Sequence, residues 1–157
     1  MTTNLQTTSK SIEHLNALLR GELSAVETYD QVIAKFSDGP ITDLMENRTC
    51  HNDRVRVLTK HITQLGGTPS TSSGSWGVLA NLTQAGAKLF GLESAINALE
   101  LGEDKGLDEY RTRFGHLDPA SAEIVRTDLL PAQERTHRKM SRLKHDGARS
   151  PSGQDRL

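Results

Sequence analysis

Apolar residues recur at alternating steps of three and four along most of the chain, a spacing typical of helices with one buried face. Near the start of the chain, Ile12, Leu15, Leu19, Val26 and Ile33 share such a face. No segment alternates apolar and polar residues as a strand would. The pattern predicts four helices, over residues 9–36, 40–65, 78–114 and 118–144.

Turn residues lie at the boundaries of these segments. Gly39 suits a turn and Pro40 suits the first position of a new helix. Asp118 is a good N-cap for the last helix. Residues 66–77 are rich in Gly, Ser and Thr and predict a long loop. Glycines in the third helical segment leave open a break near residue 91.

Length and composition set the size of the fold. A chain of 157 residues suits one domain, and an apolar share of 34% favours a thin, elongated core. We therefore expect an all-α fold, a four-helix bundle that forms a single domain over residues 9–144. The polar ends, residues 1–8 and 145–157, are predicted to be disordered.

Charge and cysteine content narrow the functional classes. With 19 Lys and Arg against 20 Asp and Glu, we expect neither nucleic acid nor a membrane as a partner. The basic residues 135–145 suit the end of a helix and are predicted to be a solvated face. Because Cys50 is the single cysteine, a reducing, cytoplasmic location is the default. A homodimer is the base-rate expectation for a homo-oligomer.

Charged residues interrupt the apolar faces at a few positions. An antiparallel helical hairpin brings residues at equal distances from its turn to the same level. By this rule Glu22 should lie level with His51, and Glu100 level with Glu134. His137 follows Glu134 by one helical turn on the same face. We expect these five side chains to meet in one layer of the bundle.

The way the two hairpins stack decides the topology. His51 and Glu100 share a level only if the second and third helices run parallel. Parallel helices need a long crossover between them, and residues 66–91 are long enough to provide it. One long crossover is the ferritin-like topology. A simple up-and-down bundle, which needs only a short loop there, is the alternative.

A layer of this composition favours a metal ion. Buried carboxylates cost several kcal/mol each unless a cation neutralises them. Carboxylates combined with imidazole suit Fe, Mn or Zn, whereas all-oxygen sites suit Ca or Mg. Glu103 competes with Glu100 for the position that faces the layer. The predicted metal ligands are Glu22, His51, Glu100, Glu134 and His137.

Short motifs add a family resemblance. LLRGELSAVETY (residues 18–29) resembles the first helix of bacterioferritins, with Glu22 at a ligand position. LELGEDKG resembles their third helix, with Glu100 at a ligand position, and ERTH (residues 134–137) matches the Glu-x-x-His of their fourth. Through LGGTPSTSSGSWGVLANL and ELGEDKGLDEY, the chain is similar to an uncharacterised bacterial family of ferritin-like four-helix-bundle proteins.

The second helix departs from the di-iron pattern. Di-iron bundles carry another Glu-x-x-His there, and the resemblance aligns those two positions with His51 and Arg54. Arginine stays protonated and cannot ligate a metal. The resemblance therefore implies a single metal ion, or an asymmetric pair, rather than a full di-iron centre. Around the ligands it implies Tyr29 as a hydrogen-bond donor, with Arg48, Arg54 and Glu103 nearby.

Two functions remain open. In the first, the bundle binds Fe, Mn or Zn and, if it is redox-active, oxidises Fe(II) or handles peroxide. In the second, it is a non-enzymatic, metal-free bundle with a stress-related or interaction function. Arg48 and Arg54 would then neutralise Glu22 and Glu100. These arginines discriminate between the two, because an active di-iron site has no use for cations at its own level.

Overall fold

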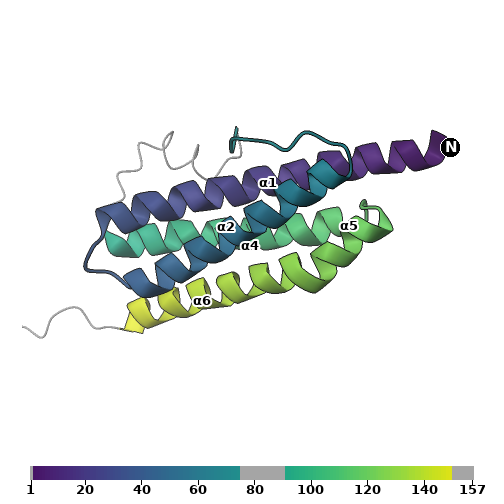
Figure 1. Ribbon diagram of the computed structural model, residues 1–157. Helices are drawn as coiled ribbons and strands as arrows, with labels where there is room; N and C mark the ends of the chain where they lie inside the picture. The colour runs from purple at the N-terminus through teal and green to yellow at the C-terminus, as the bar shows by residue number, and fades with distance from the viewer. Residues whose placement is uncertain (1, 75–90, 150–157) are drawn as a thin grey trace, which may run out of the picture.

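The computed structural model describes residues 2–74 and 91–149, and this part of the chain contains helices and turns but no strand. Its long helices pack into a bundle, so the prediction of an all-α four-helix bundle is confirmed (Figure 1). The elements are α1 (Thr2–Lys35), α2 (Ile41–Gln64), α4 (Leu92–Phe114), the short α5 (Pro119–Ile124), the π-helical turn η1 (Val125–Leu129) and α6 (Leu130–Arg149).

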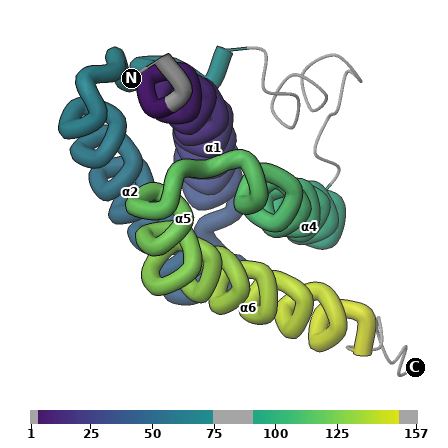
Figure 2. Tube along the Cα trace, turned by 90° about the vertical axis from the view of Figure 1, so that its right-hand side faces the viewer, coloured from purple at the N-terminus to yellow at the C-terminus, as the bar shows by residue number. Residues whose placement is uncertain are grey.

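The relative directions of the long helices follow from their hydrogen bonds. Hydrogen bonds join Tyr29 to Asn47 and Glu103, and Glu22 to Arg54 and Tyr110. The residue earlier in α1, Glu22, thus pairs with the later residues of α2 and α4, and Tyr29 pairs with the earlier ones. Both helices are therefore antiparallel to α1 and parallel to each other, which excludes the simple up-and-down alternative. The end view shows α1 between α2 and α4, with α6 opposite α1 (Figure 2).

The predicted long loop returns along α1 after α2 ends. The backbone N–H of Ser70 donates to Oδ1 of Asn16 at 2.7 Å, and Oγ of Ser73 donates to Oε2 of Glu27 at 2.8 Å. The chain thus moves back towards the end of the bundle where α4 begins. Gly91, with a φ of 94°, precedes α4. The helix predicted over residues 78–90 lies outside the described residues.

Both ends of the chain are more helical than the sequence predicts. α1 begins at Thr2 rather than near residue 9, and α6 continues to Arg149 rather than ending at residue 144. The first turns of α1 extend beyond the other helices (Figure 1), and Leu5 is 73% exposed. Apolar periodicity cannot signal a helix that buries no face. Extending an existing helix avoids the cost of nucleation, which explains why these turns form.

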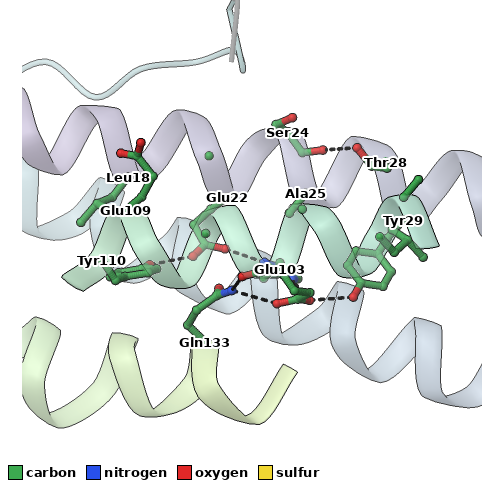
Figure 3. A pocket seen from close by; sticks show the side chains of 16 residues that line it. Leu18, Glu22, Ser24, Ala25, Thr28, Tyr29, Glu103, Glu109, Tyr110 and Gln133 are labelled. Carbon is green, nitrogen blue, oxygen red and sulfur yellow. Dashed lines mark hydrogen bonds and ion pairs between the residues drawn. The ribbon is translucent and has the colours of Figure 1, made fainter. Parts of the chain in front are cut away.

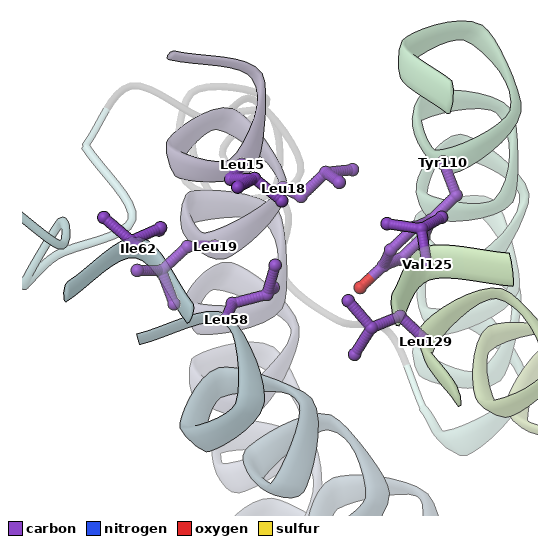
Figure 4. Packing of buried hydrophobic residues seen from close by; sticks show 8 residues of the cluster. All are labelled: Leu15, Leu18, Leu19, Leu58, Ile62, Tyr110, Val125 and Leu129. Carbon is purple, nitrogen blue, oxygen red and sulfur yellow. The ribbon is translucent and has the colours of Figure 1, made fainter. Parts of the chain in front are cut away.

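Two apolar clusters fill the bundle. One lies near α5 (Figure 4) and contains Leu15, Leu18, Leu19, Leu58, Ile62, Tyr110, Val125 and Leu129. The other lies towards the α1–α2 turn and contains Tyr29, Val32, Leu44, Ala95, Ile96, Leu99 and Met140. Charged and amide side chains are buried between them, and these form the candidate site.

Candidate functional site

A buried polar layer crosses the bundle between the two apolar clusters. Figure 3 shows part of it, with Glu22, Glu103 and Gln133 at its centre. Each long helix contributes at least two side chains, and all of them are buried. The layer consists of Glu22, Tyr29, Asn47, His51, Arg54, Glu103, Tyr110, Gln133 and Thr136.

The second helix shows how local sequence positions these groups. Its buried residues follow alternating steps of three and four, namely Leu44, Asn47, His51, Arg54 and Leu58. This spacing keeps one narrow face towards the interior. Arg48, which was predicted to lie near the ligands, is not among these buried residues. Arg48 instead lies at the surface, where its Nε donates to Oδ1 of Asp30 at 2.9 Å.

Glu22 accepts three hydrogen bonds in the layer. Nε of Arg54 and the hydroxyl of Tyr110 donate to Oε1, at 2.8 and 2.6 Å. Nδ1 of His51 lies 2.7 Å from Oε2. Burial alone would raise the pKa of Glu22, but the charges of Arg54 and His51 outweigh burial and lower it to about 2. Glu22 is therefore a buried carboxylate.

Glu103 accepts hydrogen bonds from side chains on the three other long helices. Nε2 of His51 and the hydroxyl of Tyr29 lie 2.9 and 2.7 Å from Oε1. Nε2 of Gln133 and Oγ1 of Thr136 each donate to Oε2 at 2.8 Å. Burial opposes ionisation, yet the charge of His51 and its hydrogen bond lower the pKa of Glu103. The second buried carboxylate is thus as fully paired as the first.

His51 lies between these two carboxylates. Ionised carboxylates only accept hydrogen bonds, so each ring nitrogen must carry a proton to pair with its partner. Burial lowers the pKa of His51, and so does the charge of Arg54, whose Nη2 lies 2.6 Å from Nδ1 of His51. The negative charges of Glu103 and Glu22 raise this pKa by more, so the net shift is upward. With His51 protonated, two negative and two positive charges cancel within the layer.

The side chains of the buried polar layer do not fit a metal ion in this arrangement. Glu22, His51 and Glu103 are ligand types for Fe, Mn or Zn. Their oxygen and nitrogen atoms already bond to one another, and Arg54 adds a positive charge beside Glu22. Over residues 2–74 and 91–149, no group of three or more His, Cys, Asp and Glu side chains is arranged to hold a metal.

The structure brings together only part of the predicted site. Glu22 and His51 lie in the layer at the same level, as expected. Glu103 faces the layer, and Glu100 does not. Glu100 lies nearer the start of α4, where it pairs with Lys144 and accepts a hydrogen bond from Ser141.

Glu134 and His137 turn away from the layer. Glu134 lies 3.7 Å from Arg111, and Nε2 of His137 lies 2.6 Å from Oδ1 of Asp104, both near the surface. The predicted meeting of five side chains in one layer is therefore wrong. Metal binding by any of these residues stays a prediction.

Two features of the C-terminal hairpin explain the difference. α5, η1 and α6 follow one another without a gap, and the π-helical turn η1 takes more residues per turn than an α-helix, so α4 residues meet partners further along α6 than a regular helix would give. The face of α6 is also offset by one residue from the predicted one. Val125, Leu129 and Met140 would have revealed it, since they share a face with Gln133 and Thr136.

A small cavity adjoins the layer between α1 and α4. Its volume is about 30 Å³, and small residues such as Gly21, Gly102 and Gly106 line it. Oγ of Ser24, which also lines it, has no hydrogen-bond partner among the described residues. This space suffices for about two water molecules and excludes an organic substrate.

The fold and the layer define the class of the protein as a four-helix bundle with one long crossover and a buried ion network. The chain belongs to the family described as a domain of unknown function (DUF2383), which matches residues 10–114. The match includes Glu22, His51 and Arg54 and ends before α6. No curated protein and no solved structure matches the chain. None of the described helices has the length and apolar character needed to cross a membrane.

Proposed function

We propose that the chain is a non-enzymatic helical bundle that acts through its surface, with an internal ion network at the level where ferritin-like bundles bind metal. The contact between Arg54 and Glu22 carries this proposal. Nε of Arg54 lies 2.8 Å from Oε1 of Glu22, and both side chains are 3% exposed. The guanidinium supplies the positive charge that a metal ion would otherwise supply.

The energetics of burial support the proposal. Two buried carboxylates are tolerated only when charge and hydrogen bonds compensate for lost hydration. Arg54 and protonated His51 provide the charge. Tyrosine, glutamine and threonine groups complete the hydrogen bonds of Glu22 and Glu103. A network with matched charges has little affinity to offer a further cation.

Metal content tests the proposal directly. The full chain is purified without chelator, supplemented with Fe(II), Mn(II) or Zn(II), and analysed for bound metal after desalting. We expect less than about a tenth of an equivalent of each. The urea unfolding midpoint should not move with added metal, because a ligand that binds the folded state would raise it. Oxidation of Fe(II) by O₂ should proceed no faster than in buffer.

Matched variants locate any metal that does bind. About one equivalent that is lost in Glu22→Gln or His51→Gln would overturn the proposal and assign a metal to the buried polar layer. Metal lost only in a Glu134→Ala/His137→Ala variant would overturn it in favour of those predicted ligands.

The second candidate function is a bundle that binds a single Fe, Mn or Zn ion. Its supporting observation is that His51 lies within 2.9 Å of both Glu22 and Glu103, which gives two carboxylates and one imidazole in contact. It requires Arg54 to leave Glu22. Arg54→Ala would then raise metal affinity, whereas the metal-free proposal predicts only a loss of stability.

A further inference from the structure

A groove of about 810 Å³ runs along the outside of the bundle between α2 and α6. This volume is in the range of small-molecule sites. The α2 side contributes Glu46, Asn47 and Cys50. The α6 side contributes the basic residues Arg135, His137, Arg138, Lys139, Arg142 and His145.

Several of these basic groups have no acidic partner in the part of the chain that the structure describes. Lys139 pairs with Glu46 and Asp43, and this contact neutralises Glu46, an acidic residue that lines the groove. Among the described residues, no acidic side chain pairs with Arg135, Arg138, Arg142 or His145, and all four are exposed.

The unpaired residues form one stripe. Their steps of three, four and three keep them on one helical face, and ten residues span about 15 Å of α6. Neighbouring like charges at these spacings destabilise a helix. The helix dipole compensates only near the C-terminus, and Arg135 lies in the first half of α6. The stripe is therefore unfavourable until an anion binds it.

The chemistry of the lining selects the anion. The planar guanidinium group of arginine can donate two parallel hydrogen bonds to the oxygens of a phosphate. Nucleic-acid bases need aromatic faces on which to stack. Within the described part of the chain, no Phe, Tyr or Trp lines the groove. We propose that the groove between α2 and α6 binds a linear chain of phosphates, held by Arg135, Arg138 and Arg142. This site uses different residues from the buried polar layer, so it does not depend on the proposed function.

Calorimetric titration of the full chain with tripolyphosphate, a longer inorganic polyphosphate and ATP tests the site. We expect affinity to rise with the number of phosphates and to fall steeply with salt, as counterion release requires. Tighter binding of ATP than of tripolyphosphate would assign the site to the phosphate tail of a nucleotide. The reverse order would assign it to inorganic polyphosphate. A single-stranded oligonucleotide of equal charge that binds more tightly than either would overturn the proposal.

A charge-matched pair of variants separates the groove from net charge. Arg135→Gln/Arg138→Gln/Arg142→Gln should weaken polyphosphate binding at least about tenfold, or 1.4 kcal/mol. The control Arg56→Gln/Arg111→Gln/Arg126→Gln removes the same charge from exposed residues elsewhere and should retain the affinity. Equal loss in both variants, or no binding at low salt, would overturn the proposal. Equal urea midpoints would confirm that both variants fold.

Cys50 offers a second readout in the unmodified protein. It is partly exposed and lines the groove. Bound polyphosphate should slow its alkylation by a maleimide, and the groove variant should abolish that protection. Unchanged alkylation at a saturating polyphosphate concentration would contradict binding in this groove.

Discussion

Arg54 donates from Nε to Oε1 of Glu22 at 2.8 Å inside the bundle, where both side chains are 3% exposed. The sequence resemblance to di-iron bundles aligns Arg54 with a ligand histidine, a correspondence that stays a prediction. Its guanidinium also donates to Oε1 of Gln133 at 2.9 Å, so it connects α1, α2 and α6. One residue thus links charge balance to the arrangement of three helices.

Removing this arginine should be costly. Arg54→Met leaves a buried carboxylate without its strongest partner, and we expect a loss of about 3–5 kcal/mol in the free energy of unfolding. Adding Glu22→Leu should restore much of the lost free energy of unfolding, because two buried apolar side chains have no charge that must be neutralised. Urea unfolding measures both. Arg48→Met, which breaks an exposed pair, should cost less than about 1 kcal/mol. Similar losses for Arg48→Met and Arg54→Met would contradict the role of burial.

The stability of the bundle should depend on pH through His51. Its pKa is raised above 6.5 in the folded state, so its contribution is complete below pH 6.5 and is lost as pH rises through the folded pKa. Glu22 acts in the opposite sense. Its contribution is complete above pH 4.5 and is lost as pH falls towards its folded pKa of about 2. The layer should therefore stabilise most between these limits, from about pH 4.5 to 6.5.

Comparison with His51→Gln isolates this effect. The difference in unfolding free energy between the wild type and the variant should be largest near the acidic end of that window and shrink above pH 6.5. Urea titrations across a pH series measure it. A difference that stays constant up to alkaline pH would show that His51 is not charged in the folded protein.

Gly106 should resist even the smallest side chain. A Cβ atom there would lie 2.9 Å from Nε2 of Gln133, the atom that donates to Glu103. Alanine gains about 1 kcal/mol in helix propensity, but displacing that amide breaks a buried hydrogen bond. We expect Gly106→Ala to lower the unfolding free energy by about 1–3 kcal/mol.

Gly115 is the matched control for that substitution. Its φ is −69°, and a Cβ there meets nothing within 4 Å. Gly115→Ala should be neutral or stabilising by up to about 1 kcal/mol, since it restricts the unfolded chain. If Gly106→Ala were equally harmless, Gln133 would not be held where the structure has it.

The ERTH motif should contribute little to stability. Glu134 and His137 form partly exposed ion pairs with Arg111 and Asp104. We expect Glu134→Ala/His137→Ala to change the unfolding free energy by less than about 1 kcal/mol. A loss of several kcal/mol in thermal or urea unfolding would mean that these side chains are buried after all.

Periodicity and loop length were enough to predict the architecture. Steps of three and four define α1, α2 and α4, and the long segment after α2 allows parallel helices. Helix starts such as Asp118 follow from capping, and its Oδ1 does accept from the N–H groups of Ala120 and Ser121. These signals are local, so a single sequence carries them.

The candidate site was harder to predict because its polar residues satisfy one another across helices. Asn47 and Thr136 carry no hydrophobic signal, and their burial makes sense only beside Tyr29 and Glu103. The partners that Glu103 meets on α6 depend on the π-helical turn η1, which no pattern within α4 reveals. A motif match to ERTH then favoured the wrong face of α6.

The buried polar layer also bears on how faithfully the two halves of the molecule assemble. Glu22, His51 and Arg54 lie on the α1–α2 hairpin and leave it with one surplus positive charge. Glu103 gives the α4–α6 hairpin one surplus negative charge at the same level. Each half alone would expose an unbalanced ion, and docking cancels both. A hairpin from a related bundle that lacks these groups would leave a buried charge unpaired. The layer therefore favours pairing of the α1–α2 hairpin with its own α4–α6 hairpin.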